Sequence, residues 1–122
     1  MRKILKKQDI GKKCEDLACE YLRNNGYEIL ERNFSCKLGE IDIIAKNQEY
    51  IVFIEVKTRS SICYGKPSEA VDDIKKKHIY RVAKFYIQKH NLENEFFRFD
   101  VIEVYLSKDK YKINLIKQID IK

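Results

Sequence analysis

The chain has 122 residues, of which 36% are charged and 44% are hydrophobic, with one proline and four glycines. This composition is typical of one globular domain and argues against a disordered or low-complexity chain. No apolar run approaches the roughly 18 residues of a membrane helix, and the basic N-terminus lacks the apolar stretch of a secretory signal. We therefore expect a single domain over residues 1–122, cytoplasmic and without a membrane partner, in which residues 1–10 form a basic N-terminal arm.

The net charge of +6 is unevenly distributed along the chain. Residues 1–13 carry a net charge of +5, residues 14–58 carry −4, residues 59–89 carry +5, and residues 90–122 are neutral. An acidic centre between basic segments suits a protein that binds a polyanion and places a cation on it. A basic composition is also common on ordinary solvated surfaces, so the charge alone leaves both interpretations open.

The four cysteines, Cys14, Cys19, Cys36 and Cys63, contain no C-x-x-C pair. On one helix, Cys14 and Cys19 would lie about 140° apart around the axis, which disfavours a disulfide between them. A zinc site requires more closely spaced pairs of ligands. We therefore expect free structural thiols.

The hydrophobic pattern predicts seven elements in the order α-β-β-β-α-β-β. They are a helix over residues 11–25 that ends at Gly26, strands over 27–34, 39–46 and 50–58 with a tight turn at Asn47–Gln48, a loop over 59–67, a helix from the N-cap Ser68 to about His90, and strands over 96–106 and 111–117. This order indicates an α/β domain in which a three-stranded meander, a crossover helix and two further strands form one mixed sheet flanked by helices.

The second predicted strand carries two carboxylates within an apolar stretch. Because side chains alternate along a strand, Glu40 and Asp42 are expected on one face and Ile41 and Ile43 on the other. A buried charge is costly unless it is paired or bound to a metal. The two carboxylates therefore mark this strand as a candidate site.

The third predicted strand places Glu55 and Lys57 on one face in the same way. A turn at Asn47–Gln48 sets Glu40 opposite Glu55, whereas a loop over residues 47–50 sets Asp42 opposite Glu55. Opposed carboxylates repel each other. Lys57 compensates one negative charge, and a divalent cation would compensate the others.

These residue types suit Mg²⁺ or Mn²⁺ bound to a phosphodiester. Mg²⁺ takes oxygen ligands at about 2.1 Å and usually keeps several waters and a substrate phosphate. Asp42, Glu55 and the carbonyl of Val56 could supply three ligands, and Lys57 could hold or deprotonate an attacking water. Two alternatives are a salt-bridged sheet face without chemistry, and a glycosidase carboxylate pair. The latter fits poorly, because the small basic chain has no tryptophan.

The chain resembles the YraN-like family of small bacterial proteins and, through it, the PD-(D/E)xK (restriction-endonuclease-like) superfamily and the Holliday-junction resolvases. The resemblance covers about residues 11–104 and is carried by Gly11, Glu15-x-x-Ala18-x-x-Tyr21-Leu22, Gly26-Tyr27-x-Ile29-Leu30-x-Arg32-Asn33, Gly39-Glu40-Ile41-Asp42-x-Ile44-Ala45, Val52-Phe53-Ile54-Glu55-Val56-Lys57-x-Arg59, Tyr64-Gly65, Glu69-Ala70-Val71-x-x-x-Lys75 and Arg98-Phe99-Asp100-Val101. One departure is Cys14, where the family usually has glycine.

The resemblance implies a restriction-endonuclease-like mixed sheet and a role for each matching residue. It implies that Asp42 and Glu55 are metal ligands and that Lys57 is the catalytic lysine. Glu15 matches the helical glutamate that such nucleases bring to the site, with an exposed helix carboxylate as the alternative. Glu40 is either a further ligand or a supporting group.

The basic residues have a use in this interpretation. Arg59 and Lys75 look like phosphate contacts, with ordinary solvated charge as the alternative. Lys76, Lys77 and Arg81 on the long helix could hold further backbone phosphates. No motif for reading base edges is present in the sequence, so we expect backbone-directed binding with strong salt dependence.

The sequence thus predicts a metal-dependent endonuclease that acts on branched or single-stranded DNA, using Mg²⁺ or Mn²⁺. The alternative is a non-catalytic nucleic-acid-binding module that acts with a partner in DNA processing or uptake. A third interpretation is a structural protein with an incidental site. A homodimer is a hypothesis that rests on the resolvase resemblance alone. Arg98 and Asp100, outside the candidate site, are expected to form a structural pair.

Overall fold

The computed structural model describes residues 7–60, 73–108 and 110–118. Two helices and five strands follow one another in the predicted order. They are α1 (Lys7–Asn24), β1 (Tyr27–Cys36), β2 (Gly39–Asn47), β3 (Tyr50–Ser60), α2 (Asp73–Lys89), β4 (Phe96–Ser107) and β5 (Lys110–Ile116). The predicted N-cap Ser68, and most of the predicted loop over residues 59–67, lie outside the described residues.

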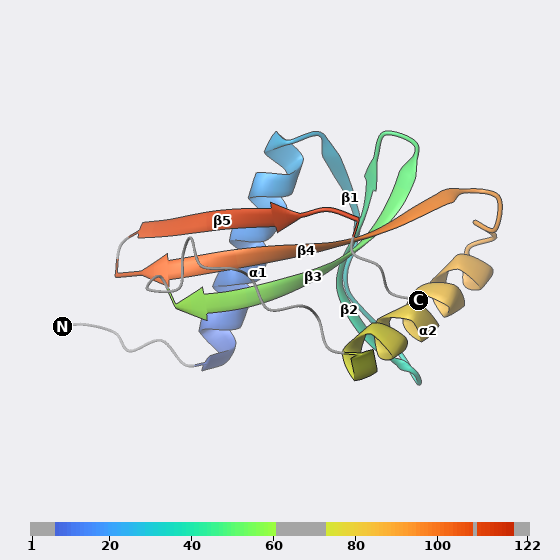
Figure 1. Cartoon of the computed structure of the whole chain (residues 1–122), viewed down its shortest axis with the longest axis horizontal. Coiled ribbons are helices and arrows are strands. Elements are labelled where there is room, and N and C mark those ends of the chain that lie inside the picture. The colour runs from blue at the N-terminus through green and yellow to red at the C-terminus, as the bar shows by residue number, and fades with distance from the viewer. Residues whose placement is uncertain (1–6, 61–72, 109, 119–122) are drawn as a thin grey trace.

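The five strands form one mixed sheet in the order β1-β2-β3-β4-β5. The first three strands pair antiparallel as a meander, β3 and β4 are parallel, and β5 is antiparallel to β4. A parallel neighbour requires a crossover connection, and α2 lies within that connection. In Figure 1, α1 crosses behind β3, β4 and β5, whereas α2 lies beside the end of β2. The predicted mixed α/β architecture is confirmed.

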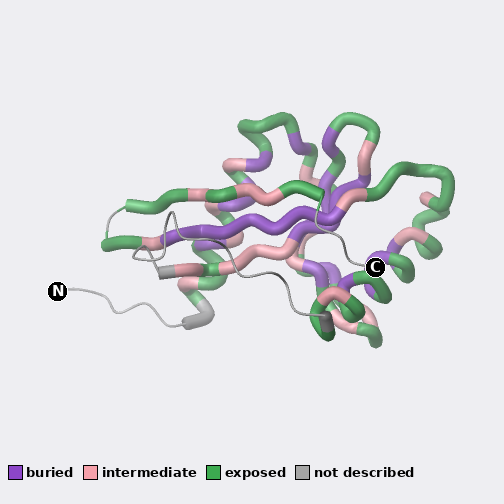
Figure 2. The backbone as a smooth tube through the Cα atoms, viewed as in Figure 1, coloured by how far each residue is buried: buried purple, intermediate pink, exposed green. Residues whose placement is uncertain are grey.

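Each helix covers a different face of the sheet, because neighbouring strand residues point in opposite directions. On β3, Ile54 belongs to the buried cluster that includes α1, while Phe53 belongs to the cluster that includes α2. β4 alternates in the same way, with Ile102 on the α1 side and Val101 on the α2 side. Seven consecutive residues of β4 are buried, which appears in Figure 2 as the long purple segment. The core therefore lies on both sides of β3 and β4.

Several element boundaries differ from the prediction. α1 begins at Lys7, so residues 7–10 are helical and only residues before them are left for the expected arm. β3 continues to Ser60 and includes the first two residues of the predicted loop. The turn between β2 and β3 consists of Gln48 and Glu49 instead of Asn47–Gln48, because Asn47 pairs with Tyr50.

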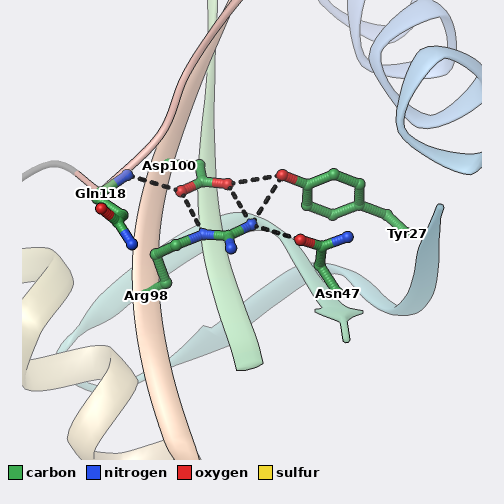
Figure 3. Close-up of polar contacts among 5 residues, drawn as sticks. All are labelled: Tyr27, Asn47, Arg98, Asp100 and Gln118. Carbon is green, nitrogen blue, oxygen red and sulfur yellow. Dashed lines mark hydrogen bonds and ion pairs between the residues drawn. The ribbon is translucent and has the colours of Figure 1, made fainter. Parts of the chain in front are cut away.

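A buried polar network fixes the end of the sheet opposite the candidate site (Figure 3). Asp100 is fully buried and accepts hydrogen bonds from the hydroxyl of Tyr27, the guanidinium of Arg98 and the backbone N–H of Gln118. Arg98 also donates to Asn47, which holds Asn47 within the strand and explains the displaced turn. The predicted structural pair of Arg98 and Asp100 is confirmed, with 3.0 Å between Nε and Oδ1.

The cysteines of the described residues are free thiols, as predicted. Cys14 and Cys19 are buried, Cys36 is partly buried, and Cys63 lies outside the described residues. Cys14 is fully buried in the cluster between α1 and the sheet, so the helix accommodates this side chain where the resembling family usually has glycine. Neither described helix is long and apolar enough to cross a membrane.

Candidate functional site

The register of β2 and β3 brings Asp42 and Glu55 together. The backbone pairing runs from Asn47 opposite Tyr50 to Ile43 opposite Ile54, so Asp42 lies across from Glu55 at the next position. This is the second of the two registers considered from the sequence, but a two-residue turn produces it where a loop over residues 47–50 was expected. The alternative pairing of Glu40 with Glu55 is therefore wrong.

Beyond these backbone pairs, the side chain of Asp42 on β2 forms the hydrogen bond to β3. Oδ2 of Asp42 accepts a hydrogen bond of 2.8 Å from the backbone N–H of Val56. The N–H and C=O of one strand residue point toward the same neighbouring strand. The carbonyl of Val56 is therefore directed to the same side as the Asp42 carboxylate, as a third ligand would require.

Strict alternation fails at Asp42, and the prediction that Ile41 and Ile43 share a face is wrong. Ile43 packs in the cluster with α1, whereas Ile41 packs in the cluster with α2. The strand therefore turns over between them, at Asp42. This change of face lets the carboxylate of Asp42 reach the backbone of β3 instead of pointing squarely away from the sheet.

A cavity of about 300 Å³ opens at this point between α2, the start of β2 and the middle of β3. Its lining combines charged residues of the sheet and the helix with apolar residues of the α2-side core. The lining residues are Gly39, Glu40, Ile41, Asp42, Ile54, Glu55, Lys75, His78, Ile79 and Phe99. Glu40 is exposed, so this carboxylate lies at the open rim of the cavity.

The two central carboxylates lack full compensation for their charge. Burial raises the pKa of Asp42 to about 6, the hydrogen bond from Val56 opposes this rise, and the nearby negative charge of Glu55 adds to it. Oε1 of Glu55 lies 3.5 Å from Nζ of Lys75. Oε2 of Glu55 is buried and has no hydrogen-bond partner among the described residues. An additional cation between these carboxylates would relieve both the desolvation and the repulsion.

The donor set fits a hard, oxygen-preferring ion better than a softer one. The described residues contain no group of three His, Cys, Asp or Glu side chains arranged around a common metal position. Mg²⁺ is often held by only one or two carboxylates, with waters and substrate phosphates completing the shell. Asp42, Glu55 and the Val56 carbonyl therefore suffice for Mg²⁺ or Mn²⁺, whereas a zinc site of protein ligands alone would need more.

Glu15 approaches the site from α1, but its carboxylate is already engaged. Its Oε1 accepts hydrogen bonds from Nε of Arg32 at 2.8 Å and from Nδ2 of Asn33 at 3.0 Å. Glu15 does not line the cavity itself. Its link to Asp42 runs through Asn33, which donates to Glu15 and lies across from Asp42 on the neighbouring strand. The alternative of an ordinary exposed helix carboxylate does not hold, because the Glu15 side chain is only 13% exposed.

The two basic residues of β3 follow Glu55 on alternate positions. Lys57 is partly buried and has no ion-pair or hydrogen-bond partner within the described residues. Nε of Arg59 donates to Oε2 of the buried Glu103 at 3.1 Å. Nη2 of Arg59 is buried without a hydrogen-bond partner in the described part of the chain, so the described residues satisfy this guanidinium only in part.

The basic residues of α2 do not form one surface. Lys75 reaches the cavity and Glu55, and Lys76 is partly buried. Lys77 and Arg81 are exposed and, by the 100° step of the helix, lie away from the side that packs on the sheet. Only the first of these four predicted nucleic-acid contacts is therefore in the cavity.

His78 lines the cavity as well, although no role was predicted for it there. The available signal was its position three residues after Lys75, because residues three apart lie on the same side of a helix. Without knowledge of which side of α2 faces the sheet, that spacing alone could not separate His78 from the exposed lysines around it.

Comparison with known proteins accounts for the motifs. The model of the family described as "Uncharacterised protein family UPF0102" matches residues 14–104. The chain belongs to the UPF0102 family. A UPF0102 protein of Clostridium botulinum (strain Loch Maree / Type A3) is 56% identical over 113 residues, which cover 90% of this chain and 92% of that protein. A UPF0102 protein of Caldicellulosiruptor saccharolyticus is 50% identical over 115 residues, which cover 93% and 98%.

Membership in UPF0102 confirms the YraN-like resemblance. The matched region contains every residue of the cavity lining and also Glu15, Lys57 and Arg59. The candidate site therefore belongs to the part of the chain that defines the family.

Proposed function

We propose that this UPF0102 protein is a metal-dependent endonuclease that hydrolyses DNA phosphodiester bonds in branched or single-stranded DNA. The observation that carries the proposal is the buried, unpartnered Oε2 of Glu55 beside the desolvated carboxylate of Asp42. Perturbed carboxylates in a cavity are candidates for function. A divalent cation bound between Asp42 and Glu55 would neutralise their negative charge. The partly buried ammonium of Lys57 follows two residues after Glu55 on the same strand.

Each residue of this site has a distinct task in the proposed reaction. Asp42, Glu55 and the Val56 carbonyl hold Mg²⁺ or Mn²⁺, which when bound acidifies water and offsets negative charge on the phosphate. Lys57, as a cation, orients the attacking water and stabilises the negative charge that develops on it. Lys75 contacts a non-bridging phosphate oxygen from the helix side, and Glu40 at the rim supports the ligands.

The proposal includes a fold and an ancestry. The motif Asp42…Glu55-x-Lys57 on two adjacent strands, with Glu15 supplied by the first helix, supports membership in the PD-(D/E)xK superfamily with a restriction-endonuclease-like fold and similarity to Holliday-junction resolvases. A four-way junction has two-fold symmetry, and such a substrate suits a homodimer. We propose a cytoplasmic location, where DNA is the partner.

The proposed DNA contacts are to the backbone. Lys75 at the cavity and Arg59, two residues after Lys57 on β3, are the nearest of the proposed contacts, followed by the partly buried Lys76. Lys77 and Arg81, which lie away from the cavity, contribute only through the long-range positive field. Such binding depends on counterion release and weakens steeply with salt.

The test is a cleavage assay on labelled four-way junction, flap, single-stranded and duplex DNA, with Mn²⁺, Mg²⁺ or EDTA. Metal-dependent cleavage is expected, and Asp42→Asn and Lys57→Ala should each reduce it by about 100-fold or more. Lys46→Ala, at an exposed position of the neighbouring strand, is the matched control for Lys57→Ala and should retain cleavage. Asp42→Asn should leave DNA binding unchanged or stronger, because it removes a negative charge and no phosphate contact.

A second candidate function is a non-catalytic nucleic-acid-binding module that acts with a partner in DNA processing or uptake. The ion pair of Lys75 with Glu55 favours it, because this ammonium already neutralises one of the two central carboxylates. Salt-sensitive DNA binding without cleavage in any metal would support this module and refute the nuclease. If DNA binding is absent or does not respond to salt, both proposals fail.

Sedimentation with and without junction DNA tests the proposed homodimer, and a monomer in both conditions would refute it.

A further inference from the structure

The carboxylate of Glu15 is held on one side only. Arg32 and Asn33 of β1 both donate to Oε1. Arg32 also bridges to Asp16 through Nη2, at 2.6 Å from Oδ1. Among the described residues, no donor contacts Oε2 of Glu15. The hydrogen bonds from Arg32 and Asn33 therefore fix the orientation of the Glu15 carboxylate and leave its Oε2 for another partner.

Asn33 makes its contact from an unusual backbone conformation. Its φ of 53° lies in the left-handed region, which non-glycine residues seldom occupy. The other non-glycine residues with positive φ in the described part of the chain, Gln48, Asn91 and Gln118, all lie in turns or beyond the ends of elements. Asn33 lies inside β1. Strained backbone of this kind persists where the surrounding structure enforces it, and it is common at functional sites.

The position of Asn33 links it to Asp42. Arg32 pairs with Ile43 and Phe34 pairs with Ile41, so Asn33 lies across from Asp42. Arg32 points toward α1 and Phe34 packs on the α2 side, although residues two apart normally share a face. Both strands therefore turn over at the same pair of residues. On one strand this change aims the amide of Asn33 at Glu15, and on the other it aims the carboxylate of Asp42 at β3.

We infer that Asn33 and Arg32 are positioning residues that hold Glu15 with its free oxygen toward the Asp42–Glu55 cavity, where that oxygen accepts a hydrogen bond from a metal-bound water. This inference rests on the proposed function. The two donors to Oε1 and the position of Asn33 across from Asp42 supply the geometry. Arg32 forms ion pairs with both Glu15 and Asp16 and so offsets part of the negative charge that α1 brings to this side of β1.

The test compares two Asn→Gly substitutions at left-handed positions. Asn33→Gly keeps the backbone conformation but removes the amide from Glu15, because glycine adopts positive φ freely. Asn91→Gly makes the same change at an exposed residue after α2 and is the matched control. Mn²⁺ binding is measured by titration calorimetry without DNA, and folding is monitored by urea unfolding. Loss of an outer-shell partner typically lowers metal affinity by about 10- to 100-fold.

We expect Asn33→Gly to weaken Mn²⁺ binding by about 10-fold or more, and Asn91→Gly to leave it unchanged, while both variants stay folded. Since Asn33 acts through Glu15, Glu15→Gln combined with Asn33→Gly should bind Mn²⁺ no more weakly than Glu15→Gln alone. If Asn33→Gly binds Mn²⁺ as the wild type does, or if the two losses add, the inference is overturned and the proposed metal site stands. If the wild type itself binds no Mn²⁺, the proposed function fails and the inference fails with it.

Discussion

Asp42→Asn should stabilise the metal-free protein even though it removes the proposed activity. The carboxylate of Asp42 is largely buried next to Glu55, and these two effects raise its pKa from 3.8 to about 6. Asparagine has nearly the same shape and keeps an oxygen that can accept the hydrogen bond from Val56. The substitution therefore removes an unfavourable buried charge without creating a cavity or leaving the Val56 N–H unpaired.

The size and the pH dependence of this effect follow from the pKa. One pKa unit corresponds to about 1.4 kcal/mol, so the rise from 3.8 to about 6 corresponds to about 3 kcal/mol. Between these pH values the folded protein binds the Asp42 proton more tightly than the unfolded chain does. The wild type therefore loses stability as the pH rises through this range. The advantage of Asp42→Asn should be absent below pH 4, grow up to pH 6 and remain near its full value at pH 8.

Urea unfolding in the presence of a chelator, at several pH values from 4 to 8, measures this difference. Glu49→Gln, at an exposed residue of the β2–β3 turn, is the control and should change stability by less than about 0.5 kcal/mol. If Asp42→Asn is no more stable than the wild type at pH 8, the carboxylate is not desolvated as the structure indicates. The same result would remove the physical argument for a cation at this position.

Two further predictions concern the framework that holds the site. Asp100→Ala should lower the free energy of unfolding by about 3–5 kcal/mol in urea, because it leaves Arg98 buried and unpaired. A loss below about 1 kcal/mol would show that the network in Figure 3 contributes little. Gly39→Ala should destabilise by about 1 kcal/mol or more, since φ is +142° and the new Cβ would lie 3.2 Å from Val82. Gly11→Ala, in open space on α1, should stabilise by about 0.5–1 kcal/mol, and equal effects at the two glycines would contradict this explanation.

The order of the elements was predictable because each element carries a strong local signal. The apolar spacing of α1 and the stop at Gly26 predicted the first helix, and the near-continuous apolar run at the start of β3 predicted a strand there. The exact turn between β2 and β3 was not predictable in this way. Asn47 suits a turn by its type, but it stays in the strand because Arg98, 51 positions later, binds its side chain.

The candidate site was predictable as a set of residues and not as a geometry. Carboxylates and a lysine within apolar strands indicated Asp42, Glu55 and Lys57, and the even spacing left two registers open. The partners of the flanking charges depended on contacts distant in sequence. Nothing in the sequence indicated that the guanidinium of Arg59 pairs with Glu103. Only the fold shows that α2 presents Lys75 and His78 to the cavity while Lys77 and Arg81 lie away from it.

The change of face at Asp42 is the feature on which the site most depends, and regular alternation gives no warning of it. Had β2 alternated strictly, Asp42 would project from one face of the sheet, and its carboxylate would not lie in line with the Val56 N–H. The partner residue Asn33 offered the relevant signal, because asparagine tolerates the left-handed conformation better than most residues do. In this strand pair, the left-handed Asn33 lies across from Asp42, at the point where both strands change faces. Here this local departure from regular geometry directs Asp42 toward Glu55 and Asn33 toward Glu15.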